Sequence, residues 1–394
     1  MSSGISGYGK RNKHSFSGAT ELALVKSGDD FFKRAVEIIA RSKKTIHFQT
    51  YIFIGDSTGK IIIDALTNAV KRGVEVFLLV DAFGSNDLAN YTIEMMTKNG
   101  IQFRKYSPLF YKYRMRFGRR LHHKIILGDE TEALIGGINV EDKYRVAGPE
   151  TPWLDYAVYI KGEVCNEIKP ICESLWKGKG YRIKRKKLLN SLSPATLNSD
   201  VIPVRLSQND WLRRKNNISK GIRNAVGHSH LSVTLVASYF LPGGKARRIL
   251  KKASQRNVSV KIILPGISDV TLAKKATMYL YGWMFRNKLE IYEWNDTILH
   301  GKINLVDDKW ASIGSYNINH LSHYSSIETN IEVFDAAFCQ VVKTELDAVI
   351  AKCHRVTYFE YLQKMNVWQK FICWCAFSFT RFLFWLEFLV LSKE

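Results

Sequence analysis

The spacing of apolar residues in the first part of the chain predicts alternating helices and strands. Residues 30–42 carry apolar side chains at helical intervals, and residues 45–53 (TIHFQTYIF) have the composition of a strand. A second helical pattern covers residues 60–71, and the continuous apolar run VEVFLLV ends at Val80. Strand, helix and strand at this spacing describe a βαβ unit with a largely buried sheet.

The same order of elements returns in the second part of the chain. A helical pattern around residues 218–226 precedes the strand-like LSVTLVASYF at 231–240, a helix at 245–256 and the strand VSVKIIL, which ends at Leu264. In both copies, turn-forming residues separate the first strand from the helix that follows it. This internal repeat predicts two α/β domains of the same kind.

Each copy ends in the same set of polar residues. The set contains a histidine, a lysine, an aspartate and an asparagine: His122, Lys124, Asp129 and Asn139 in the first copy, and His300, Lys302, Asp307 and Asn317 in the second. Counted from the histidine, the other members fall at offsets 2, 7 and 17 in both copies. One HxK(x)4D pattern alone would be a weak signal, but two copies with matched G-[GS]-x-N tails in a repeated frame are a strong one.

The spacing suits chemistry on a phosphodiester. A histidine and a lysine two residues apart project from the same face of a strand. The segments EALIGG and WASIGS predict a second strand that brings each asparagine to the same edge. Two such halves facing each other would offer two imidazoles, two ammonium groups and two carboxamides. Ammonium and carboxamide groups are donors that fit the non-bridging oxygens of a phosphodiester.

Carboxylates that could orient the imidazoles follow each asparagine. Asp155 and Glu328 both lie where strand-like alternation begins, so we expect them near the histidines. The motif acids Asp129 and Asp307 come at the turn between two strands. We favour turn formation over substrate contact for these two, although both belong to the catalytic motif.

Three other histidines lie close to the motifs. His123 is skipped by the first motif and should face the other side of its strand. His320 and His323 follow Asn317, and we interpret them as residues of a surface loop rather than of the pocket.

Composition and charge indicate a folded protein with an anionic partner. The 394 residues are enough for two or three domains, and 46% apolar with 24% charged residues is typical of a globular chain. A net charge of +22 fits nucleic acid and an anionic lipid surface equally well. The six cysteines lack the paired spacing of a zinc site, so no metal is expected. The first residues contain no apolar run of a signal peptide, which favours a cytosolic, reduced protein.

A hydrophobic segment lies near the end of the chain. Residues 371–391 (FICWCAFSFTRFLFWLEFLVL) would be roughly 31 Å long as a helix. This length could span a bilayer, but Arg381 at its middle would cost about 2.5–3.5 kcal/mol. A helix in the membrane plane is therefore favoured, and a membrane span and a buried core helix remain open.

Several motifs of the chain resemble those of a known family. The paired motifs, the GGIN and GSYN tails and the PxG turn after SYF resemble the phospholipase D superfamily. Over residues 25–355, GVEVFLLVDAFGS, RRLHHKIILGD, GGINVEDKY and LHGKINLVDD are similar to bacterial cardiolipin synthases, in particular to the shorter members without N-terminal membrane helices. The resemblance implies two pseudo-symmetric α/β domains, each a mixed sheet flanked by helices, with the active site at their interface and a hydrophobic C-terminal helix.

The expected segments follow from the repeat and the resemblance. They are a flexible N-terminus (1–20), a first phospholipase D-like domain (21–181), a basic linker (182–200), a second such domain (201–365) and a membrane-associating C-terminal segment (366–394). The RIKRKK run of the linker either touches anionic lipid or is a solvated loop.

The resemblance also implies a two-step reaction that uses no metal and no cofactor. His122 would attack the phosphorus of phosphatidylglycerol, and His300 would protonate the departing glycerol and then deprotonate the incoming hydroxyl. Charge on the phosphate oxygens would be stabilised by Lys124, Lys302, Asn139 and Asn317. Because the site is pseudo-symmetric, the sequence itself does not reveal which histidine is the nucleophile, and His122 is assigned by resemblance.

The acceptor determines the product. A second phosphatidylglycerol would give cardiolipin, whereas water would make the enzyme a phospholipase. The expected partners are anionic phospholipids, namely phosphatidylglycerol and cardiolipin, at the cytoplasmic face of a bacterial inner membrane, with peripheral or C-terminally anchored attachment.

Two other classes of function compete with this hypothesis. A nuclease of the same superfamily fits the charge and the alternating bases and aromatics of residues 111–120. The second class is a membrane scaffold that has lost its catalytic activity. Such a protein would be expected to lack a motif histidine or lysine, but both histidines and both lysines are present. The hydrophobic C-terminal segment favours lipid over nucleic acid.

Overall fold

The structure is a computed structural model of the whole chain. It describes residues 16–108, 110–111, 114–115, 119–145, 151–178, 201–213, 215–319 and 326–391. The linker at 182–200, the histidines His320 and His323, and residues 1–15 of the expected N-terminal segment lie outside these ranges.

The first half is built on a seven-stranded mixed sheet. Its strands lie in the order β2 (Glu21–Lys26), β11 (Tyr156–Lys161), β10 (Glu132–Gly136), β9 (Lys124–Gly128), β3 (Thr45–Thr50), β4 (Glu75–Asp81) and β5 (Gln102–Tyr106). β3, β4 and β5 are parallel to one another, and the other neighbours are antiparallel. The helices of this half are α2 (Asp29–Arg41), α3 (Ser57–Lys71), α4 (Asn90–Lys98) and α5 (Val164–Lys177). The predicted βαβ unit is β3, α3 and β4.

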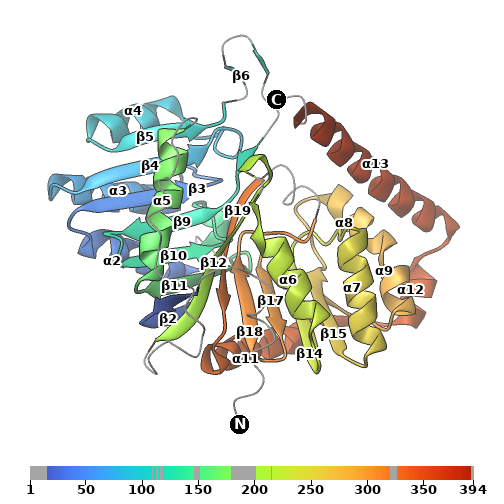
Figure 1. Cartoon of the computed structure of the whole chain (residues 1–394). Helices are drawn as coiled ribbons and strands as arrows, with labels where there is room; N and C mark the ends of the chain where they lie inside the picture. The colour runs from blue at the N-terminus through green and yellow to red at the C-terminus, as the bar shows by residue number, and fades with distance from the viewer. Residues whose placement is uncertain are drawn as a thin grey trace.

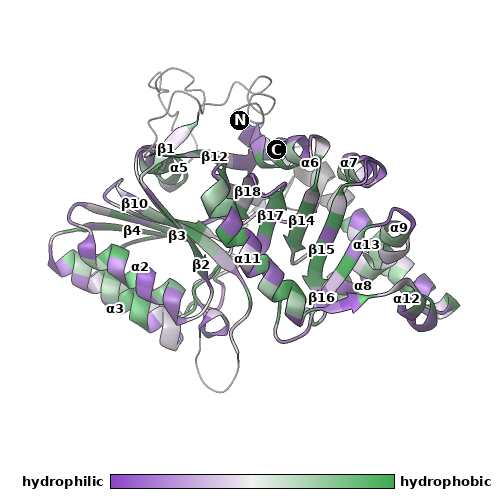
Figure 2. Cartoon of the chain, turned by 90° about the horizontal axis from the view of Figure 1, so that it is seen from below, coloured by the Kyte–Doolittle hydropathy of each residue, from purple (hydrophilic) through white to green (hydrophobic). Residues whose placement is uncertain are grey.

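The helices of this half form where the sequence gives them one apolar face and a suitable start. In α2 the buried residues include Phe31, Ala35 and Ile38, at intervals of three and four, and Asp29 and Asp30 lie in the first turn. In Figure 2 hydrophobic and hydrophilic residues alternate around α2 and α3, as expected for helices with one side on a sheet.

The second half repeats this sheet strand for strand. The order is β12 (Ile202–Asp210), β19 (Ser326–Val333), β18 (Trp310–Gly314), β17 (Lys302–Val306), β14 (Ser232–Ala237), β15 (Ser259–Pro265) and β16 (Glu290–Trp294). The helices are α6 (Asn217–Gly227), α7 (Gly244–Gln255), α8 (Thr271–Tyr279), α9 (Tyr281–Arg286), α11 (Ala336–Lys352), α12 (Tyr358–Lys364) and α13 (Val367–Leu391). β20 (His354–Val356) lies beside β16. Two pseudo-symmetric mixed sheets flanked by helices confirm the predicted fold class (Figure 1).

Strands of the first half also extend the second sheet. β1 (Ser17–Ala19) pairs with the start of β12, and β8 (Arg120–Leu121) pairs with β19. Ser17–Ala19 thus form a buried strand, although the segment 1–20 was expected to be flexible. The physical reason is that β1 covers the edge of β12, whose backbone groups would otherwise lack strand partners.

The two sheets share one core. A single cluster of buried side chains contains residues from both central regions: Ile125, Leu127, Ile135 and Val158 from the first half, and Ile303, Leu305, Ile313 and Ile331 from the second. β10 and β11 lie against β18 and β19 in this cluster. The halves therefore fold against each other, and the strands that carry the two motifs lie at their junction.

The last two helices lie on the outside of the second half. α13 crosses the outer side of α8 and runs diagonally past it in Figure 1. Among the described residues, no helix combines the length and the apolar character needed to cross a membrane.

Candidate active site

The two motif histidines lie where the halves meet. Each comes just before a central strand, His122 before β9 and His300 before β17. The backbone N–H of His122 donates to the carbonyl of Ile327 (3.1 Å), and that of His300 donates to the carbonyl of Leu154 (2.8 Å). Each histidine backbone is therefore held by the other half of the molecule.

The imidazole–carboxylate pairs are crossed between the halves. His122 Nδ1 lies 2.9 Å from Glu328 Oε2, and His300 Nδ1 lies 2.6 Å from Asp155 Oδ2. Both carboxylates are fully buried. The sequence placed Asp155 and Glu328 near the histidines, and the structure brings each next to the histidine of the opposite repeat. Neither half alone contains a complete pair.

The carboxylates define the proton positions on the imidazoles. A carboxylate accepts from Nδ1–H, which leaves Nε2 as the nitrogen for attack or proton transfer. Burial lowers the pKa of His122, and it lowers that of His300 to about 4 with help from the nearby Lys302 ammonium. At neutral pH both imidazoles of the free protein are therefore neutral.

The two motif lysines bring positive charge to the same place. Lys124 Nζ donates to the carbonyl oxygen of His122 (2.7 Å), and Lys302 Nζ donates to Ser238 Oγ (3.0 Å). Burial, and then the charge of Lys302, lower the pKa of Lys124 to about 7. The charge of Lys302 thus raises the free-energy cost of charging Lys124, and a nearby anion would offset this cost.

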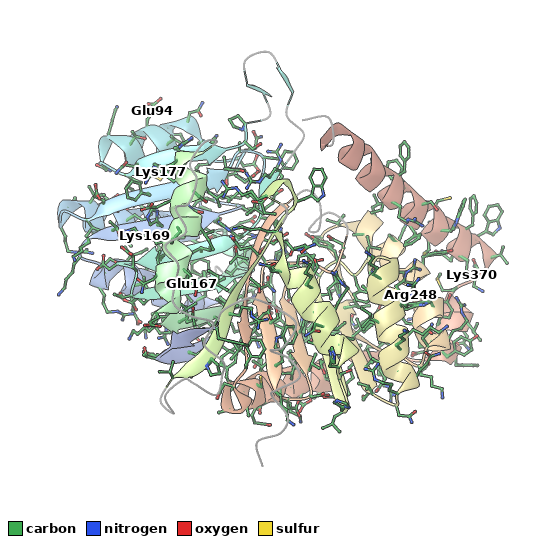
Figure 3. All side chains as sticks on the ribbon, viewed as in Figure 1. Glu94, Glu167, Lys169, Lys177, Arg248 and Lys370 are labelled. Atoms are coloured by element: carbon green, nitrogen blue, oxygen red, sulfur yellow. The ribbon has the colours of Figure 1, made fainter. Side chains whose placement is uncertain are left out.

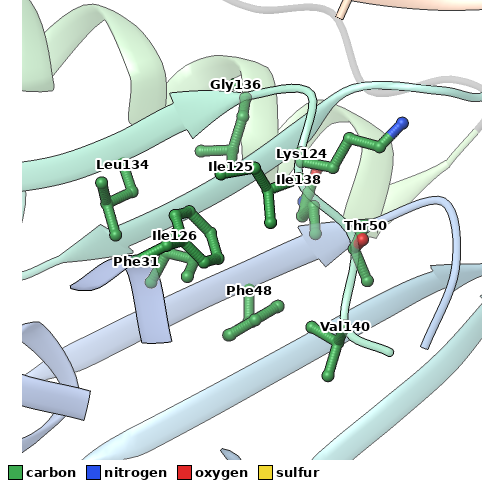
Figure 4. A pocket seen from close by; sticks show the side chains of 11 residues that line it. Phe31, Phe48, Thr50, Lys124, Ile125, Ile126, Leu134, Gly136, Ile138 and Val140 are labelled. Carbon is green, nitrogen blue, oxygen red and sulfur yellow. The ribbon is translucent and has the colours of Figure 1, made fainter. Parts of the chain in front are cut away.

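Figure 4 shows how the fold directs Lys124 toward this region. The stem of Lys124 borders a small space lined mainly by apolar side chains such as Phe48 and Ile126. The ammonium points away from these side chains. The apolar core thus packs the stem and leaves only the charged end for the site.

The two motif asparagines are buried at the same junction. Asn139 Oδ1 accepts from the backbone N–H of Ile52 (3.1 Å), and its Nδ2 donates to the hydroxyl of Tyr144 (3.0 Å). That hydroxyl lies 3.3 Å from His300 Nδ1. Because an amide NH2 has two hydrogens, the contact with Tyr144 uses only one of them. Asn317 is 3% exposed.

The two motif aspartates lie away from the imidazoles. Asp129 accepts from the backbone N–H groups of Lys43, Lys44 and Thr45 at 2.6–2.9 Å. Asp307 accepts in the same way from residues 230–232 at 2.8–2.9 Å. Each lies just beyond the far end of a five-residue strand, about 17 Å long, and the motif histidine lies before the opposite end of that strand. Their contacts fix the turn and the start of the neighbouring strand, and they do not face the imidazoles.

The residue two positions before each motif asparagine differs between the halves for a geometric reason. Ser315 Oγ donates to Glu328 Oε2, the oxygen that also contacts His122. The equivalent position in the first half is Gly137, where an added Cβ would lie 2.4 Å from Asp155 Oδ1. The G-[GS] pair in the sequence was the available signal for these positions, but it did not reveal their contact with the carboxylates.

Aromatic side chains that the sequence analysis did not select line the two imidazoles. The ring centroid of Tyr51 lies 5.1 Å from that of His122, and Tyr239 lies 6.5 Å from His300. Both tyrosines follow equivalent strands, β3 and β14, but their positions differ by one residue. The strand registers place Tyr51 at the position that Ser238 has in the other repeat, and Tyr239 at the position of Ile52. Trp153, 6.2 Å from His300, adds a third ring.

His123 has the structural position expected for the skipped residue. It is fully buried, with Nδ1 3.1 Å from Thr329 Oγ1 and Nε2 2.9 Å from Gln49 Oε1. Burial lowers the pKa of His123 to about 3, so it is neutral. It links β3 to β19 beneath the site.

The fold and the site define a class of protein, a duplicated α/β enzyme. Each half supplies one histidine, together with the carboxylate that contacts the histidine of the other half. Comparison with known proteins gives the family. Residues 35–176 and 222–350 match the family model described as cardiolipin synthase, PLD-like domain. The chain therefore belongs to this family.

Individual relatives agree with the family match. The chain is 29% identical to cardiolipin synthase B of Salmonella typhimurium over 364 residues, covering 92% of this chain and 88% of that protein. It is 26% identical to the major cardiolipin synthase ClsA of Bacillus subtilis over 359 residues, covering 90% of this chain and 74% of the relative. The fold is similar to that of a phosphatidylserine synthase from Haemophilus influenzae, with a TM-score of 0.72, 15% identity and coverage of 96% of this chain and 97% of that one.

Proposed function

We propose that the protein is a cardiolipin synthase that transfers the phosphatidyl group of one phosphatidylglycerol to a glycerol hydroxyl of another and releases glycerol. The observation that carries this proposal is the pair of crossed imidazole–carboxylate contacts at 2.9 and 2.6 Å, with two buried lysines beside them. A double displacement on phosphorus needs a nucleophile and an acid–base group on opposite sides of the phosphate, and two oriented imidazoles supply both.

In the first step, Nε2 of His122 attacks the phosphorus, and the bond from phosphorus to the glycerol oxygen breaks. His300 gives its Nε2 proton to that oxygen, so free glycerol leaves and a phosphatidyl-histidine remains. The negative phosphodiester offsets the lysine charges that disfavour protonated His300, so substrate binding itself favours the acid form. The choice of His122 agrees with its greater exposure, 17% of the side chain against 8% for His300.

In the second step, His300 accepts the proton of the incoming hydroxyl, whose oxygen attacks phosphorus and displaces His122. Lys124, Lys302 and Asn139 stabilise the charge on the non-bridging oxygens in both steps. Asn317 is assigned the same role from its equivalent position. Asp129 and Asp307 act only on the strand ends.

Water as the acceptor would make the same site a phospholipase D-type hydrolase. We further propose that the partners are phosphatidylglycerol and cardiolipin at a bacterial inner membrane, with the boundaries 182–200 for the linker and 366–394 for the membrane-associating segment. A nucleic-acid substrate fits the charge but gives no role to the hydrophobic segment.

The test is a product analysis. Purified protein is incubated with phosphatidylglycerol labelled in its glycerol headgroup, and lipids and free glycerol are measured by mass spectrometry. The proposal predicts one free glycerol for each cardiolipin formed, and neither product with His122→Ala. Phosphatidic acid without cardiolipin would show that water is the acceptor, and no reaction with phosphatidylglycerol would refute the proposed substrate.

A further inference from the structure

Large apolar side chains are exposed mainly on one surface of the second half. This surface, called here the α12–α13 surface, consists of α12, the outward face of α13 and the connection from β15 into α8. Its most exposed members are Val367 (81%), Trp368 (74%) and Phe359 (68%), and Phe371 and Ile267 are each about half exposed. A contiguous apolar surface of this kind is rare on a protein that has no partner.

α13 has two different faces. Cys373, Ala376 and Thr380 are buried at helical intervals, and Phe377 contacts the ring of Tyr279 on α8 at 4.8 Å. Small side chains therefore attach the helix to the protein. Apart from Phe377, the large aromatic side chains of α13 named above point the other way, and burial within the described part of the chain does not account for them.

The charges on and around this surface are mostly positive. Residues 266–286 and 358–383 contain six Lys or Arg side chains and two acidic residues, Asp269 and Glu360. One of the six, Lys274, is paired with Glu293. Lys370 and Arg381 are eleven residues apart, about three helical turns, so they project from the same edge of α13. In Figure 3, Lys370 on α13 and Arg248 on α7 lie on the same side of the molecule.

An anionic bilayer matches both properties at once. Its interior takes the aromatic side chains, and its headgroups attract the cations along the edge of the helix. A second copy of this chain would fit less well, because a two-fold contact through α13 would bring the same cations together.

The α12–α13 surface reaches the rim of the active site. The hydroxyl of Tyr239, whose ring lies 6.5 Å from His300, donates to Asp269 Oδ2 (2.7 Å) in the connection from β15 to α8. Ile267 and Val270 flank Asp269 and are exposed. The connection therefore joins exposed apolar residues of this surface to the aromatic ring beside His300.

We propose that the α12–α13 surface docks in the plane of an anionic phospholipid bilayer and places the rim at Tyr239 against the headgroups. This inference deepens the proposed function, because it assigns the surface through which a lipid substrate reaches the site.

The test compares two triple variants of the full chain in vesicle flotation. The first, Trp368→Ser, Phe371→Ser and Phe379→Ser, changes outward residues of α13. The matched control, Tyr91→Ser, Met95→Ser and Leu231→Ser, changes three exposed apolar residues elsewhere. Vesicles contain phosphatidylcholine alone or with an equal amount of phosphatidylglycerol. We expect the α13 variant to bind the anionic vesicles about 100-fold more weakly, from the apolar area that it loses, and the control to bind like the wild type.

A second readout separates this inference from the proposed function. Turnover of a short-chain phosphatidylglycerol that is monomeric in solution should be the same in the α13 variant and the wild type. Equal vesicle binding by all three proteins would overturn the docking surface even if turnover is normal. A wild-type dimer that the α13 variant converts to a monomer, with vesicle binding unchanged, would assign the surface to a second copy instead. Selective loss of vesicle binding in a protein without turnover would support docking and refute the enzyme.

Discussion

The crossed carboxylates allow the roles of the two histidines to be separated. Glu328→Gln and Asp155→Asn each replace a buried carboxylate by a carboxamide of the same shape. The first removes the charge 2.9 Å from His122, and the second removes the charge 2.6 Å from His300. A carboxamide can also donate to Nδ1, which would place the proton on Nε2 and block attack.

The expected magnitude follows from the geometry. Attraction between an imidazolium and a carboxylate 2.9 Å apart is about 6 kcal/mol at an effective dielectric constant of about 20. At about 1.4 kcal/mol per tenfold in rate, loss of this attraction in the transition state would slow turnover of phosphatidylglycerol by about 10⁴. We expect losses of roughly 10³–10⁴ for both variants, because the carboxamide keeps one hydrogen bond.

A substrate with a different leaving group then separates the two variants. A p-nitrophenyl ester of phosphatidic acid loses its phenolate without protonation, so its first step needs the nucleophile but no general acid. If His122 is the nucleophile, Asp155→Asn should release up to one equivalent of nitrophenolate per site in a rapid burst and then stall, because His300 can no longer activate the acceptor. Glu328→Gln should show no burst.

The assay is stopped-flow absorbance, with thermal unfolding as the control for folding. A burst in Glu328→Gln but not in Asp155→Asn would reverse the assignment of the histidines. Loss of the burst in both variants to the same extent would refute separate roles for the two pairs.

Three further predictions concern the same site. Because the pKa of Lys124 is lowered to about 7, kcat/KM should fall as the pH rises through 7. The alkaline limb of kcat should lie at higher pH, because a bound phosphate favours the ammonium form of Lys124. Coincident alkaline limbs in the two pH profiles would contradict this. Gly137→Ala should lower the activity by more than tenfold, because the new Cβ would lie 2.4 Å from Asp155 Oδ1. The control Gly244→Ala, whose Cβ meets no atom within 4 Å, should leave the activity unchanged. Equal activities of the two variants would show that the close approach of residue 137 to Asp155 does not matter. Turnover should survive dialysis against EDTA, because the two lysines and Asn139 stabilise phosphate charge in the proposed mechanism, and a loss reversed by Mg²⁺ would oppose it.

Much of the architecture could be predicted from the sequence because periodicity reports burial directly. The repeated strand–helix–strand pattern predicted two α/β halves. The motif spacing predicted each histidine and lysine on one face of a strand, whereas in the structure each lysine is the first residue of its strand and the histidine lies two residues before it. The turn role of Asp129 and Asp307 followed from their position between two strands, and the structure shows three backbone N–H groups on each. These features depend on neighbours in sequence, so local rules suffice.

The crossed pairing depended on the tertiary structure. Periodicity shows which face of β9 or β17 is buried, but not which strand of the other half covers it. The pairing of β8 with β19 and the contact of Leu154 with Leu299 bring Glu328 to His122 and Asp155 to His300. The same limit applies to Ser315, Tyr51 and Tyr239, whose roles depend on residues more than ten positions away.

The sequence by itself thus determined the duplicated fold, the family and the side chains proposed to react, because each is recorded in local spacing. Only the tertiary structure decided which histidine each carboxylate orients and which face of α13 is exposed. Both depend on contacts between distant segments, where a shared core selects one packing among several that the same local patterns allow.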